Sequence, residues 1–215
     1  MGALEREPFH WASTLLAYHH DVKSRLTSHA VASLATILLA CGGAPPSAPT
    51  ESRPAHASSG SAVERYFPLE DGRVYAYTTS ENDDTGMFVA RVYRADATHG
   101  ELRFSNGAKR FVYRPDALAY ESGAVLLSAP IRVGTSWRGE HGGTTRITST
   151  TASVEVPAGR FSACVEAVEE GGMPPKSRYS TTYCPDIGIV VLDVTAPRSG
   201  ARAVLKSYGE PVEIK

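Results

Sequence analysis

The 215-residue chain lacks both an excess of one charge and an apolar run long enough to cross a bilayer. Its formal net charge is -1 and its 22 basic residues are dispersed, so no positive stripe marks a nucleic-acid surface. The longest apolar run, residues 30–40, has 11 residues, whereas a membrane-spanning helix needs about 20. We therefore expect no nucleic-acid partner and no transmembrane helix.

The sequence also lacks the common catalytic motifs. It contains no GxSxG nucleophile elbow, no HExxH, no P-loop and no GxGxxG that opens a helix. Cys164 and Cys184 have no CxxC or HxxxH companion at metal-ligand spacing, and His56, His99 and His141 stand singly in polar or Gly-rich surroundings. We predict no catalytic residue, no metal ligand and no cofactor, and we expect that the protein is not an enzyme.

What the sequence does contain is the layout of a bacterial lipoprotein signal. Two basic residues precede the short apolar run, and small residues end it directly before Cys41. This layout is typical of an export signal with a lipobox, and a short buried helix is the alternative. We expect the lipoprotein-processing enzymes to attach lipid to Cys41, which would hold the protein on the membrane. The residues that the signal peptidase would recognise are Leu38, Leu39 and Ala40.

The chain divides into three segments. Residues 1–40 form a leader and signal peptide, residues 41–62 form the lipidated cysteine and a flexible Pro/Ser/Ala-rich linker, and residues 63–215 form one β domain. A polar stretch such as residues 1–21 is unusual before an export signal, so we hypothesise that translation begins near Val22. Gly42 rather than Asp follows the cysteine, which favours the outer membrane of the envelope over the inner membrane.

The two remaining cysteines form an even pair. Lipidation of Cys41 would leave Cys164 and Cys184 in an oxidising compartment, where disulfides persist. They lie in the expected strands 161–169 and 178–184, which the Gly/Pro-rich turn 171–175 separates. We predict a Cys164–Cys184 disulfide across this hairpin, which would stabilise the domain by about 3 kcal/mol. Two buried free thiols are the alternative.

The residues after position 63 predict an all-β domain. Short runs rich in β-branched and aromatic residues alternate with turn signals, and no segment has the 3.6-residue period of an amphipathic helix. The clearest hairpin joins strands 101–105 and 108–114 through Asn106-Gly107, because this pair tolerates the positive φ angles of a type I′ turn. We expect about ten strands in a single, mostly antiparallel curved sheet, either half-barrel or sandwich-like.

Four motifs place Gly, Pro or an aromatic residue at an expected turn or core-facing position. They are Tyr66-Phe67-Pro68-Leu69 with Gly72 and Tyr75-Ala76-Tyr77, Pro130-Ile131-Arg132-Val133-Gly134-Thr135-Ser136-Trp137, Val154-Glu155-Val156-Pro157-Ala158-Gly159-Arg160-Phe161, and Tyr183-Cys184-Pro185-Asp186-Ile187-Gly188-Ile189-Val190. Across residues 66–194 the chain resembles the TapB-like exported domains of unassigned function. Tyr75 replaces the usual Trp, and Asp186 replaces a Gly in the last turn. The resemblance implies a curved antiparallel sheet like the open half-barrels of lipoprotein carriers, with no established activity.

The first functional hypothesis is a non-catalytic binding or structural module of the envelope. A concave sheet would hold an apolar ligand or contact another envelope protein. We predict a cavity beneath an inner face built from Val74, Phe88, Val92, Phe104, Phe111, Val154 and Val165. The basic residues of the neighbouring hairpins are expected on the outer face of the sheet, with a binding face as the alternative; they are Arg91, Arg94, Arg103, Lys109, Arg110 and Arg114.

The second hypothesis is an envelope hydrolase whose site no motif reveals. It predicts polar groups that converge in a pocket around His141 and the strand that carries Glu166. Against it, His141 lies among glycines in an expected hairpin loop, and Glu166, Glu169 and Glu170 fit a solvated strand face.

Overall fold

The computed structural model describes residues 61–82, 84–197 and 199–209. In this part of the chain one short helix, α2 (Ala62–Tyr66), precedes twelve strands of an antiparallel sheet. The strands are β1 (Val74–Glu81), β2 (Asp84–Arg94), β3 (His99–Phe104), β4 (Gly107–Tyr113), β5 (Ala117–Tyr120), β6 (Val125–Ser128), β7 (Ser136–Arg138), β8 (Thr144–Val156), β9 (Gly159–Glu170), β10 (Arg178–Cys184), β11 (Gly188–Ala196) and β12 (Ser199–Gly209).

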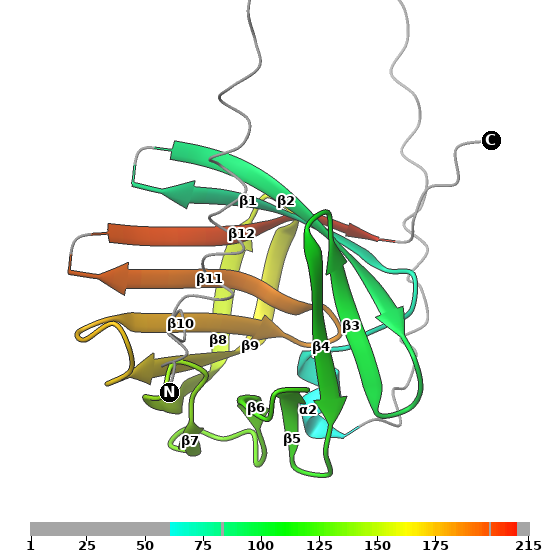
Figure 1. Cartoon of the computed structure of the whole chain (residues 1–215), viewed down its shortest axis with the longest axis horizontal. Coiled ribbons are helices and arrows are strands. Elements are labelled where there is room, and N and C mark those ends of the chain that lie inside the picture. The colour runs from blue at the N-terminus through cyan, green and yellow to red at the C-terminus, as the bar shows by residue number, and fades with distance from the viewer. Residues whose placement is uncertain (1–60, 83, 198, 210–215) are drawn as a thin grey trace, which may run out of the picture.

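The sheet is nearly closed into a barrel. Its strand order is β6-β5-β4-β3-β2-β1-β12-β11-β10-β9-β8-β7, so β1 beside β12 is the one pair of neighbours that are not consecutive in the described chain. The sheet curls until its two edge strands, β6 and β7, lie against each other (Figure 1). The expected all-β class and the single curved antiparallel sheet are therefore confirmed, with twelve strands instead of ten.

Two side chains donate to backbone carbonyl groups of the edge strand β6, one from the other edge strand and one from β10. The indole Nε1–H of Trp137 on β7 donates to the carbonyl oxygen of Val125 on β6 at 3.2 Å. The buried hydroxyl of Tyr183 on β10 donates to the carbonyl oxygen of Leu126, also at 3.2 Å.

The local signals of the sequence locate several strands well. A β3–β4 hairpin is present as predicted, but its two-residue turn is Ser105-Asn106, because Phe104 pairs with Gly107. Asn106 lacks the positive φ of the predicted type I′ turn, and Gly107, with a φ of 156°, already belongs to β4. β8 covers the Thr/Val-rich residues 144–156. β5 was not predicted, because all four of its residues are buried and it has no apolar–polar alternation. The helix α2 has only five residues, too few for a helical period, and the side chain of Ser61 caps it by accepting from the Glu64 N–H at 3.2 Å.

α2 closes one end of the barrel. It packs against β5 and β11, and its Val63 side chain is fully buried (Figure 1). Phe67 follows directly and lies with its ring centroid 5.2 Å from Phe111 and 6.5 Å from Tyr183. This end of the barrel is therefore filled by aromatic packing.

The predicted disulfide is present. Cys164 and Cys184 are bonded and fully buried, and they join β9 to β10 next to the pair Tyr183↔Val165. Leu38, Leu39, Ala40 and Cys41 lie outside the described residues, as do the whole signal peptide and nearly all of the linker. The signal, the lipidation site and the choice of membrane therefore stay predictions.

Candidate functional site

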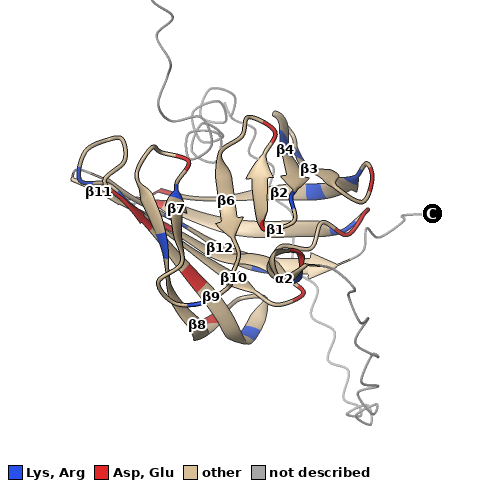
Figure 2. Cartoon of the chain, turned by 90° about the horizontal axis from the view of Figure 1, so that it is seen from below, with Lys and Arg blue, Asp and Glu red and all other residues tan. Residues whose placement is uncertain are grey.

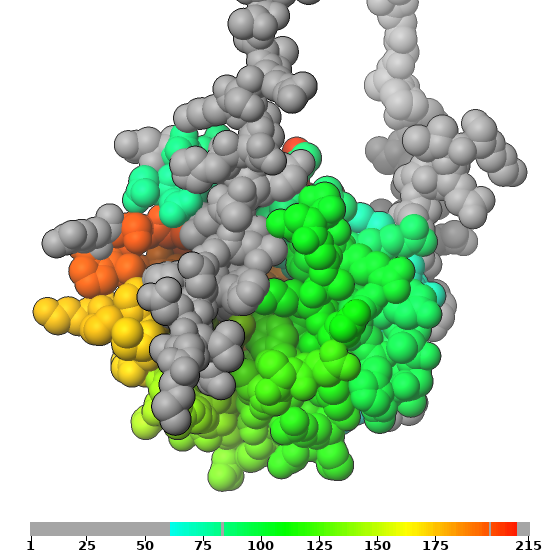
Figure 3. All heavy atoms as spheres, viewed as in Figure 1, coloured from blue at the N-terminus to red at the C-terminus, as the bar shows by residue number. Residues whose placement is uncertain are grey.

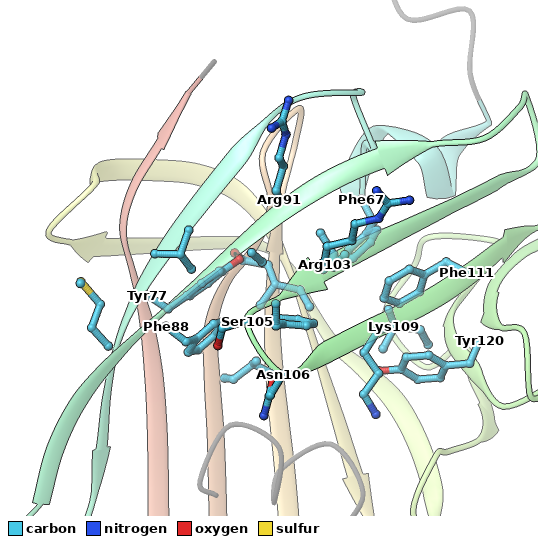
Figure 4. Close-up of a pocket in the computed structure, with 18 residues that line it drawn as sticks. Phe67, Tyr77, Phe88, Arg91, Arg103, Ser105, Asn106, Lys109, Phe111 and Tyr120 are labelled. Atoms are coloured by element: carbon cyan, nitrogen blue, oxygen red, sulfur yellow. Dashed lines mark hydrogen bonds between the residues drawn. The ribbon is translucent and has the colours of Figure 1, made fainter. Parts of the chain in front are cut away.

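A cavity of about 370 Å³ lies inside the barrel between β2 and the hairpin β3–β4 (Figure 4). We call it the aromatic cavity, because six aromatic side chains line it: Phe67, Tyr77, Phe88, Phe104, Phe111 and Tyr120. Its volume falls in the range of about 300–1,000 Å³ that is usual for small-molecule sites. In the space-filling view, β3–β6 in green and β10–β12 in orange form the two sides of the face shown (Figure 3).

The cavity exists because β2 and β3 pair along only part of their length. The ladder joins Arg91–Arg94 to Gly100–Arg103, so residues 84–90 of β2 have no partner on β3. Because β3 ends at Phe104, β2 extends beyond the tip of the hairpin β3–β4. Phe88 from this part of β2 and Phe104 from the end of β3 border the cavity, with their ring centroids 5.9 Å apart.

Two ring pairs form opposite walls of the aromatic cavity. Tyr77 and Phe88 stack at 4.8 Å with an interplanar angle of 11°. Phe111 and Tyr120 lie 5.2 Å apart on the other side, as Figure 4 shows. The Tyr77 hydroxyl donates to the carbonyl oxygen of Ile189 at 2.8 Å, and burial raises the pKa of this phenol well above 10. Tyr77 is therefore neutral, its hydroxyl already has a hydrogen-bond partner, and its ring gives the cavity a largely apolar surface.

Three of the seven residues predicted for the inner face line the cavity, namely Phe88, Phe104 and Phe111. The prediction is wrong for Val74. It lies directly opposite the exposed Arg91 in the β1–β2 ladder, so its side chain is on the same outer face of the sheet. Val92 and Val165 are buried in the filled core, and Val154 packs against it. Alternation along β1 places Tyr77 inside instead of Val74.

The inward face of β4 carries one cation. Its inward positions are Lys109, Phe111 and Tyr113, whereas Arg110 between them is exposed. The expectation of an outward Lys109 is therefore wrong. The Lys109 ammonium lies 5.8 Å from the centre of the Tyr120 ring, and burial lowers the pKa of this amine. Elsewhere, charged residues of both signs are scattered over the strands (Figure 2).

A second group of polar residues lies beside the cavity, around the loop before β8. The Glu169 carboxylate accepts from the backbone N–H groups of His141 and Gly143, both at 2.9 Å, and contacts His141 Nδ1 at 3.0 Å. Burial would raise the pKa of Glu169, but these hydrogen bonds lower it below the usual value of 4.5. The His141 ring also stacks on Tyr179 at 3.5 Å. Glu169 therefore organises the loop.

Glu140 differs from Glu169 because burial dominates its environment. Burial raises its pKa to about 7, although His141, Lys109 and Tyr120 all act to lower it. A carboxyl group with this pKa is half-ionised near neutral pH.

The strand that carries Glu166 does bring a polar group to His141 as predicted, but that group is Glu169 and not Glu166. Glu166 accepts from Thr148 on β8 and from Ser180 on β10, at 3.1 Å each, and has the opposite parity on β9 to Glu169. The sequence could not single out Glu169, because an adjacent register would place Glu166 inside instead. The space bordered by Glu140, His141 and Glu169 measures only about 30 Å³.

No group of three or more His, Cys, Asp or Glu side chains among the described residues is arranged to hold a metal ion. Within the same residues, no helix has both the length and the apolar character needed to cross a membrane.

The fold and the aromatic cavity define the class: a nearly closed, twelve-stranded antiparallel barrel with an internal apolar site. No family model and no curated protein matches the chain. One similar solved structure is a "putative exported protein with YmcC-like fold" from Bacteroides fragilis, at 13% identity and a TM-score of 0.48. Another is a "putative lipoprotein" from Parabacteroides distasonis, at 12% identity and a TM-score of 0.45. Each match covers 67% of this chain and 98% of the other.

Proposed function

We propose that the protein is a membrane-anchored lipoprotein of the bacterial envelope whose β domain binds a small apolar molecule and catalyses no reaction. The aromatic cavity carries the binding half of this proposal. It combines a volume of about 370 Å³ with walls of stacked aromatic rings, and it lies within a disulfide-linked barrel. A preformed apolar cavity binds an apolar ligand with little loss of protein conformational freedom.

The lipobox before Cys41 supports the anchored half of the proposal. The TapB-like resemblance belongs to the proposal as well, supported by the four motifs of the β domain. In those motifs Gly134 has a φ of 90° and Gly188 a φ of 105°, values that L side chains rarely adopt. A backbone requirement at these positions explains the glycines without a catalytic role.

The surroundings of His141 favour binding over the alternative, an envelope hydrolase. A general base must reach a substrate, but the His141 ring is held between Glu169 and Tyr179. The neighbouring space of about 30 Å³ is far smaller than a usual substrate site.

The binding proposal is tested by filling the cavity. Leu102 lines it from β3, and Ala108 is exposed on β4 of the same hairpin. We expect the wild-type domain to bind the neutral fluorophore N-phenyl-1-naphthylamine, with a rise in fluorescence. Leu102→Trp should weaken this binding at least about tenfold, because the indole occupies ligand volume, which corresponds to about 1.4 kcal/mol.

Ala108→Trp is the matched control, since it adds the same indole on the outside and should bind like the wild type. Thermal melting of both variants checks that they fold. Equal binding by the wild type and a folded Leu102→Trp variant, or no binding by either, would contradict the proposed function.

A further inference from the structure

The charges around the aromatic cavity all have one sign. Among the described residues that line it, the side chains that are charged at neutral pH are Arg91, Arg103 and Lys109, and none of the lining residues is an Asp or a Glu. Arg91 and Arg103 are exposed and face each other in register across β2 and β3, and Arg103 is paired with Glu101. The described lining of the cavity is thus mostly apolar, and its charged members are cations.

Lys109 differs from both arginines in its direction, and from Arg103 in its lack of an ion pair. It shares the inward parity of Phe111 on β4, and Figure 4 shows it next to Tyr120 at the cavity wall. No carboxylate of the described residues lies within 4.0 Å of its ammonium group, whereas Arg103 and Arg110 on the same hairpin both pair with Glu101. The acid that influences it, Glu140, is itself buried with a pKa raised to about 7.

A half-buried ammonium group without a counter-ion is unfavourable in an apolar wall, and a ligand that supplies an anion would remove this cost. Resting on the proposed function, we infer that the ligand is an anionic amphiphile. Its hydrocarbon part lies against Tyr77, Phe88 and Phe104, and its anionic head binds the Lys109 ammonium group. A fatty-acid carboxylate is the simplest ligand of this class.

The experiment measures how dodecanoate and dodecan-1-ol displace N-phenyl-1-naphthylamine from the whole processed protein. Both competitors have the same chain, and only dodecanoate carries a charge. We expect the wild type to bind dodecanoate about tenfold more tightly than dodecan-1-ol, the size expected for one charge-assisted hydrogen bond. Lys109→Met keeps the aliphatic stem and should abolish the preference while leaving dodecan-1-ol binding unchanged. Lys109→Arg should largely restore it.

Arg114→Met is the control for net charge, because Arg114 is exposed after the end of β4 and does not line the cavity. It should keep the wild-type preference. Equal affinity of the wild type for the two competitors, or a preference that survives in Lys109→Met, would overturn the inference and leave apolar binding intact. Failure of the fluorophore and both competitors to bind would instead overturn the proposed function, so the two failures are distinguishable.

Discussion

At the scale of single residues, the two glutamates next to His141 show how surroundings decide protonation. Glu169 accepts three hydrogen bonds, two of them from backbone N–H groups, and its pKa is lowered. Glu140 precedes the same histidine, but burial raises its pKa to about 7. The two carboxyl groups therefore affect the free energy of unfolding in different pH ranges and with opposite signs.

Glu140→Gln should stabilise the protein at pH 8 and have little effect at pH 4. At pH 4 the Glu140 carboxyl is protonated in both the folded and the unfolded chain. As the pH rises from about 4.5 to about 7, the Glu140 carboxyl ionises in the unfolded chain before it ionises in the folded protein. The free energy of unfolding therefore falls over this range, and the full decrease is reached above pH 7.

We expect a gain of about 2 kcal/mol at pH 8, allowing for partial solvent screening. Urea unfolding at both pH values measures it, and a gain of equal size at pH 4 and pH 8 would refute the assignment to ionisation. Glu169→Gln is the contrasting variant. It should destabilise the protein above pH 4.5. The lowered pKa of Glu169 means that its ionised form stabilises the folded protein at those pH values, and this stabilisation is lost as the pH falls.

At the scale of elements, the disulfide and the turn after it hold β9, β10 and β11 together. Cys164 and Cys184 join β9 to β10 where their ladder ends at Val165↔Tyr183. Two residues later, Asp186 adopts a φ of 62° in the turn into β11, where the TapB-like pattern has glycine. Asp tolerates this left-handed conformation better than most side chains, and its N–H donates to the Arg65 carbonyl oxygen at 2.7 Å.

The double variant Cys164→Ala/Cys184→Ala should lose about 3 kcal/mol of stability. The disulfide closes a loop with a sequence separation of 20, and its removal restores conformational freedom to the unfolded chain. Calorimetry should show a melting temperature lower by roughly 10 °C. The wild type in reducing agent should show a similar loss, and the variant should not respond to reductant. A wild-type melting temperature that is unchanged by full reduction would refute the prediction.

At the scale of the whole molecule, closure of the sheet creates the site. The barrel curls until Trp137 on β7 reaches the Val125 carbonyl of β6, which encloses the inner face. α2 and Phe67 fill one end, while the incomplete pairing of β2 with β3 leaves the aromatic cavity. The proposed lipid anchor and linker (residues 41–62) would keep this barrel near the membrane, where amphiphiles are abundant.

Cys41→Ser should prevent lipidation and leave the signal segment attached. Two or three acyl chains hold a protein stably on a membrane, whereas one chain binds it only marginally. Intact mass spectrometry of the wild type from the native membrane fraction should show an N-terminus at Cys41 with the mass of a diacylglyceryl group. Cys41→Ser should be found as a precursor or in the soluble fraction. A wild-type product that retains residues 1–40 without lipid would contradict the anchor and the envelope role together.

The sequence by itself determined the features that depend on neighbouring residues. Asn106-Gly107 indicated the hairpin β3–β4, although the turn itself is Ser105-Asn106, and β8 coincides with a long Thr/Val-rich run. The pairing of Cys164 with Cys184 followed from their number and compartment. Phe88, Phe104 and Phe111 were also predictable as inward residues, because alternation along a strand is local.

Only the tertiary structure decided what depends on register and curvature. Whether Glu166 or Glu169 faces inward changes with a shift of one residue. The inward direction of Lys109, by contrast, follows from that of Phe111 by alternation along β4. The cavity itself arises from ladder bonds that are absent between two strands and from the approach of two distant edges. These are long-range relations, and no local pattern of residue types encodes them.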